Sequence, residues 1–204
     1  MLREMLPLPP VTKALIIANF AVYVAQEWLG DGVLLYFALW PLGMPSIPGL
    51  PGFQPWQIVT YGFLHGSLMH ILFNMFAVYM FGGEVERVIG PKRYLNLYFG
   101  AVITAALTQI VVQSIAGADP LPTVGASGGV FGLLLAFGLF FPNRIILLLI
   151  PPIPLPARLL VVLYGALELY LGVTGTQQGV AHFAHLGGML GAWLVIRRWL
   201  RRAR

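Results

Sequence analysis

Six long apolar stretches, separated by segments that contain most of the prolines and charged residues, dominate the chain. An α-helix needs roughly 20 residues, at ~1.5 Å each, to cross the ~30 Å hydrocarbon core of a bilayer. The apolar stretches come close to this length. We therefore predict six transmembrane helices, over residues 12–29, 68–85, 94–115, 125–141, 157–173 and 180–200.

This pattern predicts an all-α membrane protein, a compact six-transmembrane-helix bundle in a single domain over residues 1–204. The fourth and fifth spans are short and flanked by proline or glycine, so re-entrant segments are an alternative there. The first span resembles a signal peptide, but no small-residue cleavage site follows it. The apolar run 145–150 is too short to cross a bilayer.

The first outer loop, residues 30–66, is unusually apolar. Trp40, Phe53 and Trp56 alternate there with five prolines. Aromatic side chains of this kind favour the headgroup zone of a membrane. We expect the loop to be partly embedded in the membrane.

Composition supports a membrane protein. Of 204 residues, 58% are hydrophobic and 9% are charged, against about 25% charged in soluble domains. The chain has no cysteine, which excludes disulfide and thiolate chemistry. The net charge of +5 is spread between apolar spans, so we expect no nucleic-acid partner.

The basic residues predict an orientation. All twelve Lys and Arg residues fall at the two termini and in the second and fourth loops. Because cytoplasmic segments carry the excess of Lys and Arg, both termini are predicted to be cytoplasmic. The compact length and the lack of a recognisable targeting peptide favour a prokaryotic inner (plasma) membrane.

Polar residues from three spans are predicted to lie in one layer near the outer face. His70 and Asn74 share one face of the second span, because residues four apart align on a helix. Ser127 begins the fourth span and His185 lies near the start of the sixth. Polar residues at membrane depth are costly and usually face a bundle interior or a wet cavity. We expect Ser127 to lie within hydrogen-bond reach of His185, as a nucleophile and its base must.

Small residues support close approach of these helices. Gly128 and Gly132 are four apart on the fourth span, and Gly187 and Gly191 are four apart on the sixth. Such pairs let helix backbones approach tightly in lipid, although ordinary packing uses them too. Phe131, one turn below Ser127, either packs against the His185 ring or is a plain core residue.

Each of these residues has a structural alternative. A membrane serine, or a histidine–asparagine pair, often only ties helices together by hydrogen bonds. His182 and His185, with His65, suggest a metal site, but no nearby cysteine or carboxylate is evident, and we predict neither a metal nor a cofactor. The run Gly125-Ala126-Ser127-Gly128-Gly129 matches the nucleophile elbow of α/β-hydrolases, which needs a preceding strand and is rejected here. Glu168 is the acid that could face the cavity, yet we predict a serine–histidine dyad rather than a triad.

The chain resembles the rhomboid family of intramembrane serine proteases, from about Trp56 to Gly191. The resemblance rests on three motifs in order, namely His70-x-x-x-Asn74, Gly125-Ala126-Ser127-Gly128, and Ala184-His185 followed by Gly187 and Gly191. It implies that Ser127 is the nucleophile and His185 the general base. His70, Asn74 and the Ser127 backbone N–H would form the oxyanion site. Glu86 resembles the acidic residue of the family at the inner end of the second span.

Two positions depart from the family pattern. Gln57 follows Trp56 where the family often has arginine, and Phe131 stands where many members have tyrosine. The first departure questions how the first outer loop is anchored. The second removes a hydroxyl but leaves a ring.

The resemblance implies an endopeptidase that cleaves peptide bonds in or next to transmembrane segments of membrane-anchored proteins, through a Ser127–His185 dyad. Its partners would be transmembrane protein substrates and the lipid bilayer, and its site would open to the outer face. The alternative is a non-catalytic relative that binds membrane helices in the same cavity. A small-molecule transporter would need repeated halves or several buried charges, which the sequence does not offer.

Overall fold

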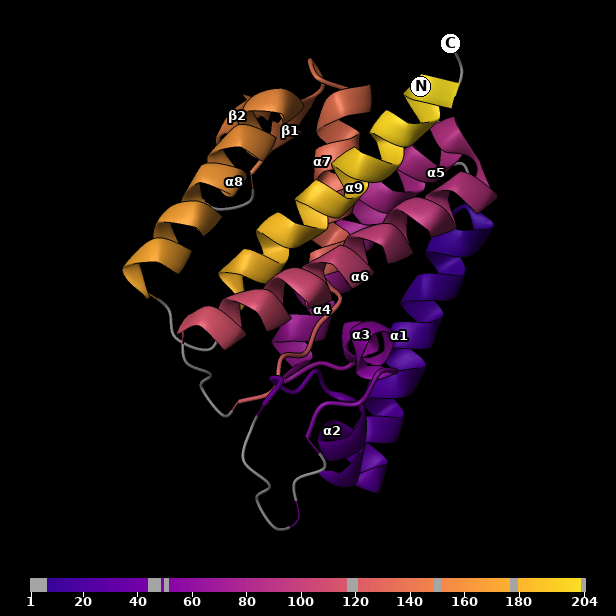
Figure 1. The fold of residues 1–204 in the computed structure, drawn as a ribbon. Helices are drawn as coiled ribbons and strands as arrows, with labels where there is room; N and C mark the ends of the chain where they lie inside the picture. The colour runs from indigo at the N-terminus through magenta and orange to yellow at the C-terminus, as the bar shows by residue number, and fades with distance from the viewer. Residues whose placement is uncertain are drawn as a thin grey trace.

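The computed structural model describes residues 7–43, 49, 52–116, 121–148, 152–176 and 180–202. Long helices lie side by side in a bundle, and the two ends of the chain lie at the same end of it (Figure 1). The helices that match predicted spans are α1 (Pro10–Leu29), α4 (Leu68–Ala77), α5 (Gly83–Ile89), α6 (Pro91–Ala116), α7 (Ser127–Phe140), α8 (Ala157–Thr174) and α9 (His182–Arg202). A π-helical turn, Val78–Gly82, joins α4 to α5, so the second predicted span is one helical rod with a widened turn.

Three of the described helical segments are long and apolar enough to cross a bilayer. They are Leu68–Ile89, Pro91–Ile115 and Ala157–Thr174, and the apolar helix α7 is shorter. The chain is therefore an integral membrane protein with a mainly helical fold. The count of six spans stays a prediction.

The helix ends follow from local chemistry. Ser67 precedes α4, and its Oγ accepts a hydrogen bond from the His70 backbone N–H at 3.2 Å, as an N-cap does. Gly90 ends α5 with a positive φ of 78°. Pro91 then starts α6, where its missing N–H costs nothing.

Helices α6, α7 and α9 form the packed centre of the bundle. Gly188 of α9 lies directly on the backbone of Gly128 in α7, leaving no room for a side chain. The predicted pair Gly187 and Gly191 faces α6 instead, where a Cβ on Gly191 would lie 2.6 Å from the Gly100 carbonyl oxygen. The close contact between α7 and α9 therefore uses a neighbouring glycine of the same run.

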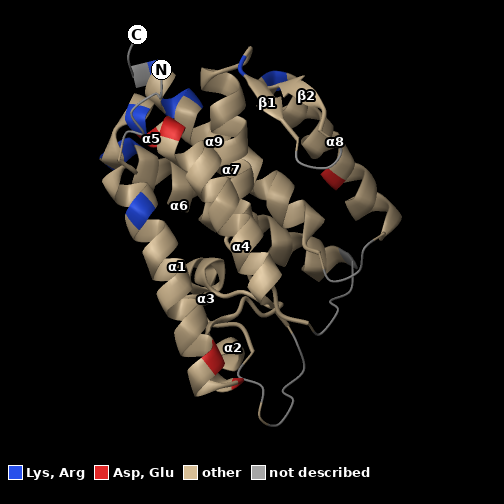
Figure 2. Ribbon diagram, turned by 180° about the vertical axis from the view of Figure 1, so that it is seen from behind, with Lys and Arg blue, Asp and Glu red and all other residues tan. Residues whose placement is uncertain are grey.

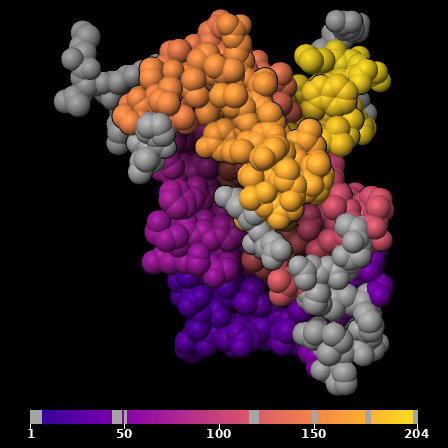
Figure 3. All heavy atoms as spheres, turned by 90° about the vertical axis from the view of Figure 1, so that its left-hand side faces the viewer, coloured from indigo at the N-terminus to yellow at the C-terminus, as the bar shows by residue number. Residues whose placement is uncertain are grey.

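Helix α8 lies on the outside of this centre. It covers part of α9 and presents one side outward, as the space-filling view shows (Figure 3). Only 17% of its most apolar stretch is buried, against 39% for the corresponding stretches of the other two candidate spans. It is the most loosely packed of the three.

A short hairpin precedes α8. Strands β1 (Ile145–Leu147) and β2 (Pro154–Pro156) pair antiparallel, with Ile146 opposite Leu155. The all-α prediction missed it. Residues 149–150, at the end of the predicted apolar run, lie outside the described residues.

The first outer loop contains α2 (Gly32–Phe37), α3 (Gln57–Thr60) and the 3₁₀ turn Tyr61–Phe63. Gln57 is fully buried and anchors the loop. Its Oε1 accepts from the backbone N–H groups of Trp40 and Gln54, and its Nε2 donates to the carbonyls of Tyr36 and Gly52, at 3.1–3.2 Å. An amide with both donors and acceptors thus anchors this loop without an arginine. Pro45, Pro48 and Pro51 lie outside the described residues, and the membrane depth of the loop stays a prediction.

Glu86 ties α5 to the start of α1. Its carboxylate accepts hydrogen bonds from the backbone N–H groups of Val11 and Thr12, at 3.0 and 2.7 Å, and from the Thr12 hydroxyl at 2.7 Å. These N–H groups belong to the first turn of α1, where no intrahelical acceptor exists. The buried acid therefore completes the start of α1.

Candidate functional site

Ser127 is the first residue of α7, at the end of a tight turn. Gly125 enters the turn with φ 129°, and its N–H donates to the Tyr61 carbonyl at 3.0 Å. A Cβ on Gly125 would lie 2.8 Å from the His70 ring, so only glycine fits. The Ser127 backbone N–H is one of the donors that a helix N-terminus leaves without an intrahelical acceptor.

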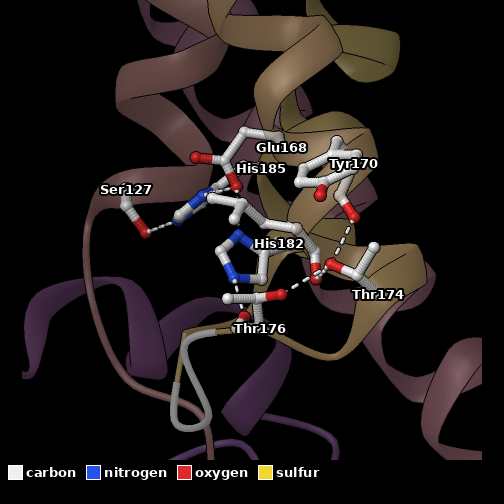
Figure 4. Close-up of polar contacts among 8 residues, drawn as sticks. Ser127, Glu168, Tyr170, Thr174, Thr176, His182 and His185 are labelled. Carbon is white, nitrogen blue, oxygen red and sulfur yellow. Dashed lines mark hydrogen bonds and ion pairs between the residues drawn. The ribbon is translucent and has the colours of Figure 1, made fainter.

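Ser127 and His185 meet across α7 and α9. Ser127 Oγ lies 2.8 Å from His185 Nε2, and the two side chains face each other (Figure 4). The distance is that of a good hydrogen bond between a hydroxyl and an imidazole. The residues are 58 positions apart in sequence, and only the packing of the two helices joins them.

An acid lies beside this pair, although the sequence predicted a serine–histidine dyad rather than a triad. Glu168 of α8 is buried, and its Oε2 lies 2.8 Å from His185 Nδ1. The sequence places Glu168 in the outer half of the fifth predicted span. The direction of its side chain depends on how α8 packs on α9, which the sequence does not give. Figure 4 shows the carboxylate directed at the imidazole.

His182 is the second partner of this carboxylate. Its Nδ1 lies 2.7 Å from Glu168 Oε2, and its Nε2 lies 3.2 Å from the Thr176 carbonyl oxygen. His182 is one turn before His185 on α9, so both imidazoles reach the same oxygen. From the sequence alone, His182 was expected at most as a metal ligand.

Phe131 stacks on His185. The ring centroids are 4.3 Å apart and the ring planes differ by 5°. This flat contact limits rotation of the imidazole without a hydroxyl. Of the two alternatives stated for Phe131, the packed arrangement is the one that the structure contains.

His70 and Asn74 of α4 line the same cavity as Ser127. The Gly66 N–H points to His70 Nδ1 at 3.4 Å, so the ring proton belongs on Nε2, the atom that faces Gly125. The Asn74 amide donates one hydrogen bond to the His70 carbonyl at 3.0 Å, which leaves its second N–H for another acceptor. Two side-chain donors and the N–H of Ser127 therefore border the same space.

A cavity of about 650 Å³ connects these groups. Its lining includes His70, Asn74, Ser127 and His185. Gln109 and Gln113 of α6 also line it. They were not among the predicted site residues, although two glutamines at i, i+4 spacing in an apolar span were a signal. A second hollow of about 670 Å³ lies at the opposite end, around Glu84 and Arg144, and contains no nucleophile–base pair.

The cluster Glu168, His182 and His185 also has the composition of a metal site. One ligand atom from each lies within 4.8 Å of the others, and catalytic zinc sites use three protein ligands. In this structure the three groups already satisfy one another at hydrogen-bond distances. The arrangement favours a carboxylate that accepts two hydrogen bonds.

His65 lies behind His70 and has no exposed surface. Its ring meets the His70 ring edge-on at 5.0 Å, and its two ring nitrogens have no hydrogen-bond partner among the described residues. Burial lowers the pKa of His65 from 6.5 to about 4, so the ring is neutral at physiological pH. It is not part of the three-residue cluster above.

The fold and the site together define a helical membrane protein with a serine–histidine pair in an internal cavity. The sequence profile of the Rhomboid domain matches residues 52–202, so the chain belongs to the rhomboid family. The motifs at His70, Ser127 and His185 all fall inside the match.

Similar curated proteins come from bacteria. The chain is 33% identical over 128 residues to the protein named Rhomboid protease GlpG of Klebsiella pneumoniae subsp. pneumoniae, and 34% identical over 128 residues to that of Salmonella choleraesuis. Each match covers 63% of this chain and 42% of the relative. The chain therefore matches less than half the length of these relatives.

Proposed function

We propose that this protein is an intramembrane serine endopeptidase that cleaves membrane-anchored proteins in or next to their transmembrane segments. One observation carries the proposal, namely the 2.8 Å contact between Ser127 Oγ and His185 Nε2 inside a polar-lined cavity. The names of the bacterial relatives, each called a rhomboid protease, support the same activity.

In the proposed mechanism, Ser127 Oγ attacks the scissile carbonyl carbon while His185 Nε2 takes the hydroxyl proton. A tetrahedral intermediate forms, with negative charge on the former carbonyl oxygen. His185 then gives the proton to the leaving amine, and the acyl group remains on Ser127. Water, deprotonated by His185, releases the acyl group and restores the serine.

The oxyanion would be held by the Ser127 backbone N–H, His70 Nε2–H and the second N–H of Asn74. Each donor of this kind contributes about 10²–10³ in rate where it has been measured. The tautomer that the Gly66 N–H favours for His70 supports this role.

The substrate segment must unwind before cleavage, because a helix keeps its carbonyl groups hydrogen-bonded. The polar lining of the cavity supports access of water to Ser127. We propose that the cavity opens to the outer face of a bacterial inner membrane, that both termini are cytoplasmic, that six spans cross the bilayer, and that residues 1–204 form one domain.

Covalent labelling tests the proposal. Purified protein in detergent is incubated with a fluorophosphonate, and in liposomes with single-span model substrates whose products are mapped by mass spectrometry. We expect labelling and cleavage in the native protein, neither in Ser127→Ala, and both strongly reduced in His185→Ala. Binding of the substrates without labelling or cleavage would instead support a non-catalytic membrane-helix binding protein.

A further inference from the structure

Glu168 is the buried acid that a serine–histidine dyad does not use. It lies on α8, whereas the nucleophile lies on α7 and the base on α9. Its Oε2 is within 2.8 Å of both His185 Nδ1 and His182 Nδ1. We propose that Glu168 is the positioning acid of the site and that it makes the dyad a triad; this rests on the proposed function.

The hydrogen bond to Glu168 selects the tautomer of His185. An ionised carboxylate accepts hydrogen bonds and donates none, so the proton of the neutral imidazole belongs on Nδ1. Nε2 then carries a lone pair, and it is Nε2 that lies 2.8 Å from Ser127 Oγ. The base is therefore prepared to take the hydroxyl proton.

The same carboxylate stabilises the charge that develops during the reaction. When Nε2 takes the serine proton, His185 becomes an imidazolium with Glu168 Oε2 at hydrogen-bond distance. The acid of a serine protease triad acts in this way without itself becoming protonated. Stacking of Phe131 holds the ring in the plane that points both nitrogens at their partners.

His182 explains how a carboxylate stays ionised in a buried place. Both of its ring nitrogens face acceptors, Glu168 Oε2 at 2.7 Å and the Thr176 carbonyl at 3.2 Å. A buried carboxylate needs such partners, because an isolated buried charge is very costly. His182 therefore gives Glu168 a second hydrogen-bond partner beside His185.

The test compares Glu168→Gln and Glu168→Asp with the native chain. Glutamine keeps the size and one acceptor but adds a donor, which favours the wrong tautomer of His185. Exchange of the triad aspartate for asparagine lowers kcat about 10⁴-fold in soluble serine proteases. We expect Glu168→Gln to lower kcat for a transmembrane substrate by about 10²–10⁴ with KM little changed, and Glu168→Asp to recover part of the loss.

A matched control separates positioning from simple support of the fold. Glu86→Gln changes another buried carboxylate that ties two helices, at the far end of the bundle. We expect it to lower the melting temperature but to leave kcat of the folded protein within about threefold, the reverse of Glu168→Gln.

Nitrogen NMR of ¹⁵N-histidine-labelled protein gives a readout that does not depend on activity. The chain has four histidines, so the spectrum is simple to assign. We expect the neutral Nδ1–H form for His185 in the native protein and a shift toward the Nε2–H form in Glu168→Gln. This result stands even if the protein cleaves nothing, so failure of the proposed function is distinguishable from failure of the inference.

Three outcomes would overturn the inference. The first is a Glu168→Gln variant with kcat within about threefold of native. The second is a loss of activity with an unchanged His185 tautomer and a lowered melting temperature, which assigns Glu168 a purely structural role. The third is native activity that EDTA abolishes and zinc restores, which assigns the cluster to a metal ion.

Discussion

At the scale of single residues, Gly125 and Phe131 set the shape of the site around Ser127. Gly125 has a positive φ and lies against the His70 ring, so its lack of a side chain lets the turn and the ring share the same space. Phe131 covers one face of the His185 ring. These apolar contacts hold the polar groups in place without competing for their hydrogen bonds.

His65 predicts a dependence of stability on pH. Its folded pKa of about 4 lies below its usual 6.5, so between these values the unfolded chain binds more protons than the folded one. The contribution of neutral His65 to the free energy of unfolding is therefore present above pH 6.5 and is lost as the pH falls toward 4. From about pH 7 to about pH 5 the loss is about 2 kcal/mol.

The measurement is the melting temperature in detergent across this range, for the native chain and for His65→Gln. Glutamine does not titrate, so the variant should lose less stability on acidification, although it is less stable at neutral pH. Parallel curves for the two proteins would assign the acid sensitivity to other groups.

At the scale of secondary-structure elements, Glu86 is the main polar link between α5 and the start of α1. We predict that Glu86→Gln lowers the free energy of unfolding by about 1–3 kcal/mol, because the first turn of α1 loses a charged acceptor. Thermal unfolding in detergent measures this.

Glu84 offers a control two residues away. It pairs with Arg87 and Arg144 at 3.3 Å on a partly exposed surface, where ion pairs contribute little. Glu84→Gln should change the free energy of unfolding by less than about 1 kcal/mol. Equal losses in both variants would show that burial of Glu86 has no special effect.

The long helices were predictable from the sequence because each is a long apolar run, and Ser67 marked the start of α4 as its N-cap. Two features could not be predicted, because neither changes the apolar pattern of the sequence. They are the π-helical turn Val78–Gly82 and the hairpin before α8. The grouping of Ser127 with His185 followed from their shared depth, from the glycine pairs on their two spans and from the family resemblance. The contact of Glu168 with His185 could not be predicted in the same way, because depth says nothing about the rotation of α8 around its axis.

At the scale of the whole molecule, charge is distributed unevenly. Lys and Arg residues gather near the end that carries both termini, and most of the bundle is free of them (Figure 2). Ser127 begins α7, whose other end, Phe140, lies next to the hairpin at the basic end. The distribution supports the proposed orientation, with the cavity toward the outer face.

Loose packing of α8 predicts that its outer end moves to admit substrate. A Cβ on Gly172, near that end, would lie 3.0 Å from the Phe183 ring of α9, so cysteines at both positions can be joined by a short bifunctional thiol reagent. Because the native chain has no cysteine, the link is specific. We expect the linked protein to lose cleavage of transmembrane substrates by at least about tenfold but to keep labelling by a small fluorophosphonate.

The control link joins α7 to the first half of α8, at the end of the helix away from Gly172. A Cβ on Gly138 of α7 would lie 3.4 Å from Val161 Cβ, close to the spacing of a disulfide, so Gly138→Cys with Val161→Cys should form one. We expect this link to leave cleavage nearly unchanged. Full cleavage by the protein linked at Gly172 and Phe183 would contradict movement of α8.

Glu168 lies on the loosely packed α8 and the imidazole that it orients lies on the central α9. Any displacement of α8 large enough to pass a polypeptide would withdraw the carboxylate and leave the histidine free to turn. Substrate entry and cleavage would then occur one after the other. The peptide bond would be cleaved only after α8 has returned to its place beside α9. This order would prevent cleavage of membrane proteins that contact the open site only briefly.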